Sequence, residues 1–149
     1  MTSQTVKGSA AARKRYWARC HLGWRFIARV SPNDGHVAVA QLQNQGLVSG
    51  VITQNVDGLH QAAGASDVVE LHGALDRVVC LSCRRLTSRE DLELRLTAAN
   101  PGFTRERVEI KPDGDVDLEA VHGFGGVDCD GCSGVHKPDV VFFGGTVAR

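Results

Sequence analysis

A run of amide and carboxylate side chains directly after an apolar stretch is the first candidate for ligand chemistry. The apolar residues from Leu47 to Ile52 predict a short buried strand, and the polar residues Gln54, Asn55 and Asp57 follow it. These side chains offer directional hydrogen-bond donors and acceptors for a polar ligand. The competing interpretation is a plain turn, since Asn and Asp also initiate turns.

The second candidate is an imidazole at the end of a neighbouring strand. The β-rich run from Val68 to Leu71 is followed by His72, a side chain suited to accepting a proton near neutral pH, and by Gly73, which lets the backbone turn freely. In open α/β sheets, ligands bind beyond the carboxyl ends of the strands. We therefore expect both polar stretches to line one cleft, although a lone histidine in such a place is more often structural.

Four of the five cysteines form two C-x-x-C pairs, the spacing of a metal site. The pairs are Cys80 with Cys83, and Cys129 with Cys132. Each pair supplies two thiolates, so two pairs complete a tetrahedral structural zinc site without an open position. No apolar signal segment is seen, and thiols that stay reduced favour a metal over disulfides. The alternatives are four thiols without a metal, or His122 or His136 as a substitute ligand.

Helices and short strands are expected to position these groups. The helical spacing of Trp17, Cys20, Trp24 and Ile27 predicts an apolar stripe on a helix from about Ser9 to Arg29. The remaining predicted elements are a helix from Asn33 or Asp34 to about Gln45, a short helix from Gly58 to Ala63, a helix from Arg89 to Ala99 capped by Ser88, an irregular insertion over 103–126, and an apolar strand from Val140 to Phe143.

Charge and composition narrow the classes of partner. Seventeen basic and seventeen acidic residues in 149 give a net charge of zero, so neither nucleic acid nor a membrane surface is an expected partner. No apolar run approaches the roughly 20 residues that span a bilayer. A cytoplasmic location is therefore expected.

Four motifs in the same order resemble the sirtuins, the NAD-dependent protein lysine deacylases. The matching segments are Thr53–His60, Glu70–Gly73, the two C-x-x-C pairs and Lys137–Gly144. The resemblance implies an α/β fold, a partial Rossmann-like parallel sheet with helices, plus a small zinc-binding module. It implies a Rossmann-like catalytic region over 13–77, a zinc module with an insertion over 78–136, and a returning substrate-cleft strand over 137–149. Residues 1–12 are expected to be a disordered N-terminus, because its polar start lacks apolar anchors.

The resemblance also implies roles for the matching residues. His72 would be the general base, while Gln54, Asn55 and Asp57 would bind NAD at its nicotinamide end. The substrate cleft for an acylated-lysine protein or peptide would be formed by Val141, Phe142, Phe143 and Gly144. The implied reaction transfers the acyl group from lysine to ADP-ribose with release of nicotinamide, and zinc at the four cysteines would be structural.

The chain also departs from the sirtuin pattern. No glycine-rich diphosphate loop precedes Arg13, and Gly145 stands where the family commonly has glutamate. We therefore expect the chain to be an internal slice of the family fold, and a slice of this kind can lose activity or need a complementing partner. The alternative function is a non-catalytic, zinc-stabilised peptide-binding module.

Overall fold

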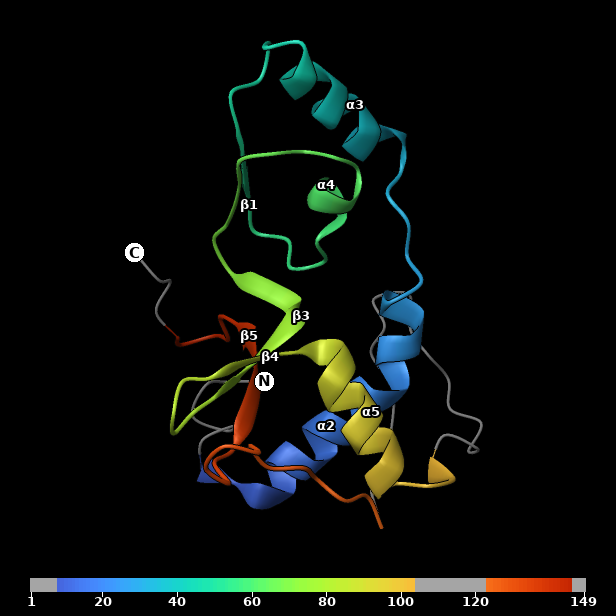
Figure 1. The fold of residues 1–149 in the computed structure, drawn as a ribbon, viewed down its shortest axis with the longest axis vertical. Coiled ribbons are helices and arrows are strands. Elements are labelled where there is room, and N and C mark those ends of the chain that lie inside the picture. Colours follow the sequence, from blue (N-terminus) through green and yellow to red (C-terminus); the bar gives the residue numbers. More distant parts are fainter. Residues whose placement is uncertain (1–7, 104–122, 146–149) are drawn as a thin grey trace.

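The structure, a computed structural model, describes residues 8–103 and 123–145 (Figure 1). The helices are α2 Ala10–Ile27, α3 Asp34–Asn44, α4 Leu59–Ala62 and α5 Arg89–Ala99. The strands are β1 Val51–Thr53, β2 Val68–Glu70, β3 Gly73–Cys80, β4 Leu86–Ser88 and β5 His136–Val140. The predicted insertion falls mostly on 104–122 and His122 lies there too, so both are outside the described residues.

Helices α3 and α5 begin at the side-chain caps that were predicted for them. Asn33 accepts from the backbone N–H groups of Gly35 and His36, and forms a capping box with the His36 side chain. Ser88 accepts from the Asp91 N–H at 3.0 Å and starts α5. The predicted helices from about residue 9, from 33 or 34, from 58 and from 89 are confirmed within two residues. The first includes Ala10–Ala12, which the domain division had placed in a disordered terminus.

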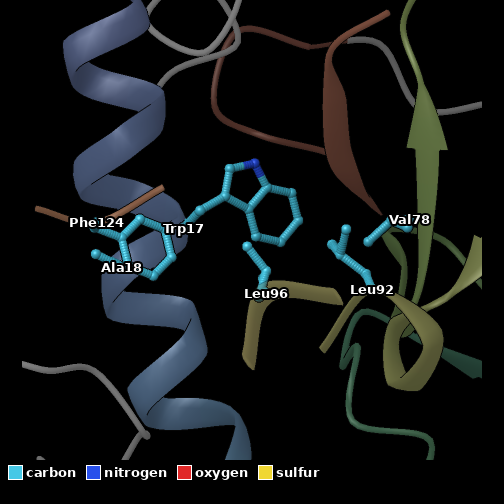
Figure 2. Packing of buried hydrophobic residues seen from close by; sticks show 6 residues of the cluster. All are labelled: Trp17, Ala18, Val78, Leu92, Leu96 and Phe124. Atoms are coloured by element: carbon cyan, nitrogen blue, oxygen red, sulfur yellow. The ribbon is translucent and has the colours of Figure 1, made fainter. Parts of the chain in front are cut away.

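The hydrophobic core lies between α2, α5 and β3 (Figure 2). It consists of Trp17, Ala18, Val78, Leu92, Leu96 and Phe124. The Trp17 indole N–H also donates to the carbonyl oxygen of His136 at 3.3 Å, so the core residue holds the start of β5 as well. Segments that come before and after the first cysteine pair in the sequence therefore pack together in this core.

A charged network is buried beside this core, which the helical pattern did not predict. Arg89 is 3% exposed, and its guanidinium lies 2.7 Å from the Glu93 carboxylate and 4.8 Å from the centre of the Trp24 ring. It also donates to the carbonyl oxygen of Cys20 at 3.1 Å. His21 is fully buried and its Nδ1 lies 2.5 Å from the other oxygen of Glu93. These contacts connect α2 to α5.

The first sheet is the parallel pair β1 and β2, and the prediction that its first strand is buried was wrong. Ile52 is paired with Val69, and these two side chains are 73% and 53% exposed. Side chains alternate between the two faces of a strand, so paired residues share one face. Among residues 8–103 and 123–145, nothing covers that face. Leu47, which precedes the strand, is 71% exposed.

The second sheet is antiparallel with the order β4-β3-β5. The last strand is His136–Val140 rather than the predicted Val140–Phe143. Its pairing with β3 continues to Val140 opposite Gly73, after which the chain turns, with the Gly145 N–H donating to the Phe142 carbonyl oxygen at 2.8 Å. Phe143 is 85% exposed at this turn, so the apolar run marked the end of a strand and not its centre.

Strand β3 contains a bulge that faces the first sheet. Ala74 pairs with Asp139 and Val78 pairs with Pro138, so residues 75–77 have no counterpart on β5. Within the bulge, the Leu75 N–H donates to the carbonyl oxygen of Val56 at 2.9 Å. The bulge therefore connects the zinc-module sheet with the polar loop after β1.

None of the described helices has the length and apolar composition required to cross a membrane. A parallel sheet with helices and a separate antiparallel module match the predicted fold class.

Candidate functional site

The ends of β1 and β2 bring the first polar stretch and the candidate base together. Thr53 pairs with Glu70 in the parallel register, and the Leu71 N–H continues the ladder by donating to the Thr53 carbonyl oxygen at 2.9 Å. His72 Nδ1 then lies 3.2 Å from the carbonyl oxygen of Gln54. Because Nδ1 faces a carbonyl acceptor, the proton is expected on Nδ1, which leaves Nε2 free to accept one. The neutral ring is thus in the tautomer that a general base needs.

The structure of the loop after β1 is compatible with both interpretations of it, a turn and a ligand site. The Asn55 backbone N–H donates to Thr53 Oγ1, and Asp57 Oδ1 accepts from the Leu59 N–H, each at 3.0 Å. Gly58, between them, has φ of 69° and starts α4. The side-chain amide of Asn55 is exposed and makes no hydrogen bond with another described residue. The turn therefore fixes the backbone and leaves an amide available.

Asp57 also lines a cavity of about 360 Å³ below the loop. The wall is mostly apolar and includes Trp24 and Ile27. Ligand pockets commonly measure some 300 to 1,000 Å³ and combine apolar walls with a few polar groups. The cavity therefore lies beside the loop after β1 and has the size and the mixed lining of a small-molecule site.

A larger cleft of about 690 Å³ runs along the end of β5. Three of the four predicted substrate residues line it, namely Val141, Phe142 and Gly144. Phe143 instead extends into solvent, 85% exposed, outside the residues that line this cleft. The Val141 N–H donates to the carbonyl oxygen of His72 at 2.9 Å. The backbone of His72 is therefore hydrogen-bonded to a residue that lines the cleft.

An ion network that sequence reasoning missed joins the two sheets at the cleft. Arg77 donates to Glu70 at 2.9 Å and to Asp139 at 3.3 Å. The other oxygen of Glu70 accepts from Gln61 of α4 at 2.7 Å. Burial alone would lower the pKa of Arg77, but these carboxylates raise it above its ordinary value. No local pattern marks this network, because Arg77 and Asp139 are 62 residues apart in sequence.

The four paired cysteines form one cluster. Their sulfur atoms all lie within 4.8 Å of one another, with 3.5 Å between Cys80 and Cys132 and 3.7 Å between Cys83 and Cys129. A tetrahedral ion with bonds of 2.3 Å to sulfur requires sulfur atoms about 3.8 Å apart. The backbone N–H of Cys83 lowers the pKa of Cys80 to about 6, whereas contact with the Cys83 thiol raises the pKa of Cys132 to about 12, so a bound cation is needed to hold all four sulfur atoms as thiolates. The cluster fits a zinc ion.

The turns that hold the cysteines leave no room for larger residues. A Cβ added to Gly134 would lie 2.8 Å from Cys80 Sγ and 2.6 Å from Ser82 Oγ.

His136 is not part of the described cluster. It is buried, its Nδ1 lies 3.4 Å from the Val127 carbonyl oxygen, and burial lowers its pKa. The alternative that His136 replaces a cysteine ligand was therefore wrong.

Known proteins resemble this chain over nearly its whole length. A sequence model described as the Sir2 family matches residues 2–149. The "NAD-dependent protein deacetylase 1" of Streptomyces coelicolor is 58% identical over 99% of the chain and 50% of its own length. The "NAD-dependent protein deacylase SIR4" of Monosiga brevicollis is 46% identical over 94% of the chain and 48% of its own length. The chain thus spans about half the length of these curated relatives.

Solved structures are similar as well. A Sir2 protein in complex with p53 peptide and NAD+ superimposes with a TM-score of 0.69 at 28% identity, covering 93% of this chain and 47% of the other. Sir2Tm bound to a propionylated peptide gives a TM-score of 0.70 at 27% identity, covering 99% of this chain and 53% of the other. Both likenesses extend over the two sheets described above.

Proposed function

The chain belongs to the Sir2 family, and from that premise we propose that it carries the central part of an NAD-dependent protein lysine deacylase. The reaction transfers the acyl group of an acylated lysine to ADP-ribose and releases nicotinamide. The relatives that share 58% and 46% of its residues carry the names of such enzymes. Since the chain spans about half of those proteins, the activity is a proposal about its site.

One observation carries the proposal. The candidate base His72 lies against the backbone of Gln54 at 3.2 Å, and its own carbonyl oxygen accepts from Val141 at 2.9 Å. One residue is thereby in contact with both the NAD motif and the substrate strand. His72 takes up the proton of a ribose hydroxyl, a role suited to an imidazole near neutral pH.

Three polar residues would hold the nicotinamide end of NAD. Asn55 offers its uncommitted amide, Asp57 contributes a carboxylate at the 360 Å³ cavity, and Gln54 presents an exposed side chain for the ribose. When bound, NAD supplies the ribose carbon that accepts the acyl oxygen. Trp24 and Ile27 form part of the apolar wall of this cavity.

Zinc would be held by Cys80, Cys83, Cys129 and Cys132 and would stabilise the fold without touching substrate. The region 78–136 then forms the zinc module, and 13–77 with 137–149 forms the catalytic region, although β3 runs across the boundary at 77/78. A location in the cytoplasm suits these thiols, because they stay reduced there.

The acyl-lysine peptide would lie in the 690 Å³ cleft as an added strand. Val141, Phe142 and Gly144 line it just beyond the last strand. Main-chain hydrogen bonds supply the affinity in this mode of recognition, and side-chain pockets supply the specificity.

Calorimetric titration of the full chain with NAD, followed by turnover of an acetyl-lysine peptide, tests the proposal. We expect NAD to bind, and His72→Ala to abolish turnover while NAD binding persists. His60→Ala is the matched control, because that imidazole packs against His36 with ring centres 4.9 Å apart and has no proposed role in the reaction. If the chain bound the peptide but no NAD at millimolar concentration, the zinc-stabilised peptide-binding module would be the correct function.

A further inference from the structure

Five charged side chains line the 690 Å³ cleft. The whole chain has a net charge of zero, so an excess charge in the cleft belongs to the cleft alone. The five are Glu70, Arg77, Arg84, Lys137 and Asp139. Gly144 and Gly145 also line the cleft and add no charge. With three basic and two acidic side chains, the lining carries one excess positive charge.

Both carboxylates of the cleft face inward toward one partner. Arg77 contacts Glu70 at 2.9 Å and Asp139 at 3.3 Å, and Gln61 donates to the remaining oxygen of Glu70 at 2.7 Å. The Glu70 side chain is only 15% exposed. Both oxygens of Glu70 and one oxygen of Asp139 are engaged by these donors, so the positive charge of Arg77 weakens the attraction of both carboxylates for a positive charge on a bound peptide.

The basic side chain of Arg84, which also lines the cleft, is placed differently from the two carboxylates. Arg84 is exposed and forms no ion pair with another described residue. Its backbone N–H donates to the carbonyl oxygen of Cys80 at 3.0 Å, so the cysteine cluster fixes its position. Lys137 lies along the same cleft, where its ammonium group donates to the neutral carbonyl oxygens of Pro138 and Val140.

We propose that Arg84 is a specificity-determining residue that selects acyl-lysine peptides with Asp or Glu close to the modified lysine. The inference rests on the proposed function, since it assumes that the 690 Å³ cleft receives the peptide. A carboxylate on the peptide side chain meets the Arg84 guanidinium, which is the favoured geometry for a charge-assisted hydrogen bond. A basic residue at the same place meets a like charge and is rejected.

Fluorescence anisotropy with three acetyl-lysine peptides tests this inference on the full chain. The peptides share the acetyl group and length and differ only in acidic, neutral or basic flanking residues. We expect the acidic peptide to bind roughly two- to fivefold more tightly than the neutral one, as is typical of one partly exposed ion pair. The difference should shrink at 1 M salt, where the screening length falls to about 3 Å.

Two variants and one control separate specificity from general electrostatics. Arg84→Gln should remove the preference and Arg84→Glu should reverse it, while the affinity for the neutral peptide stays unchanged. Arg85→Glu is the control, because Arg85 is the neighbouring exposed arginine and is not among the cleft-lining residues. It should leave the order of the three peptides unchanged.

Two results would overturn the inference alone: equal affinities for the three peptides, or a shift with Arg85→Glu as large as with Arg84→Glu. A different result, no binding of any acetyl-lysine peptide, would overturn the proposed function together with this inference.

Discussion

Replacing Glu93 with glutamine should lower the free energy of unfolding by about 3 kcal/mol, since breaking one partner of a buried ion pair costs about 3 to 5 kcal/mol. The change removes the anion that compensates the guanidinium of Arg89, whose side chain is 3% exposed, while that of Glu93 is 14% exposed. We expect the low end of the range because the glutamine oxygen still accepts a hydrogen bond from Arg89. An exposed pair would contribute only about 0.2 to 1 kcal/mol, so burial decides the magnitude.

Urea unfolding followed by circular dichroism measures this loss. Glu90→Gln is the matched control, since Glu90 lies on the same helix but is exposed in its first turn. It should lose only the interaction with the helix dipole, about 0.3 to 1 kcal/mol. If Glu93→Gln lost no more than the control, the reasoning that Arg89 needs a buried counter-charge would be refuted.

Three further predictions follow from the same structure. Burial alone would raise the pKa of Glu93, but contact with His21 and the charge of Arg89 lower it below its ordinary value of 4.5, so the unfolded chain binds the proton first as the pH falls. Stability from this carboxylate is therefore present above pH 4.5 and lost below it, and urea titrations from pH 7 to pH 3 should show a shallower decline for Glu93→Gln; parallel curves would contradict this. Elemental analysis should find one zinc per chain, and Cys83→Ser or a chelator should unfold the zinc module, which circular dichroism would detect. A fully folded, metal-free chain would rule out the zinc site. Gly73→Ala should lower the melting temperature more than Gly64→Ala, because both have positive φ but only at Gly73 would a Cβ overlap the Asp139 carbonyl oxygen; equal losses would count against that clash.

The helices could be predicted from the sequence because their signals are local. Asn33 and Ser88 each cap a helix whose first turn lies within three residues of the cap, so nothing distant is needed to place them. The same holds for the two cysteine pairs, where each C-x-x-C turn brings two thiols together by itself. The closure of the two pairs into one cluster, between residues 46 apart in sequence, was expected from the resemblance to the sirtuins, because so long a gap weakens the argument from spacing.

Burial and strand ends were harder to predict because they depend on neighbours far away in sequence. Ile52 was expected to be buried on hydrophobicity alone, yet its face of the sheet is uncovered among the described residues. The full burial of His21 was not predicted, because its partner Glu93 lies on α5 and no local pattern connects the two residues. The role of Arg77 depends likewise on Asp139, which no periodic pattern connects to it.

The approach of His72 to Gln54 could be anticipated in outline. Parallel strands that end at the same edge deliver their next residues side by side, and this geometry follows from the strand prediction. The exposed position of Phe143 could not be anticipated, because Val140–Phe143 is apolar throughout and the turn after β5 is set by pairing with β3.

The bulge in β3 makes the number of residues between Ala74 and Val78 a constraint in itself. Successive side chains of a strand point to opposite faces, so adding or deleting one residue there would invert every side chain that follows. Arg77 would then turn away from Glu70, and the bond from Leu75 to Val56 would lose its register. Relatives should therefore tolerate exchange of residue types in this segment far better than insertions or deletions.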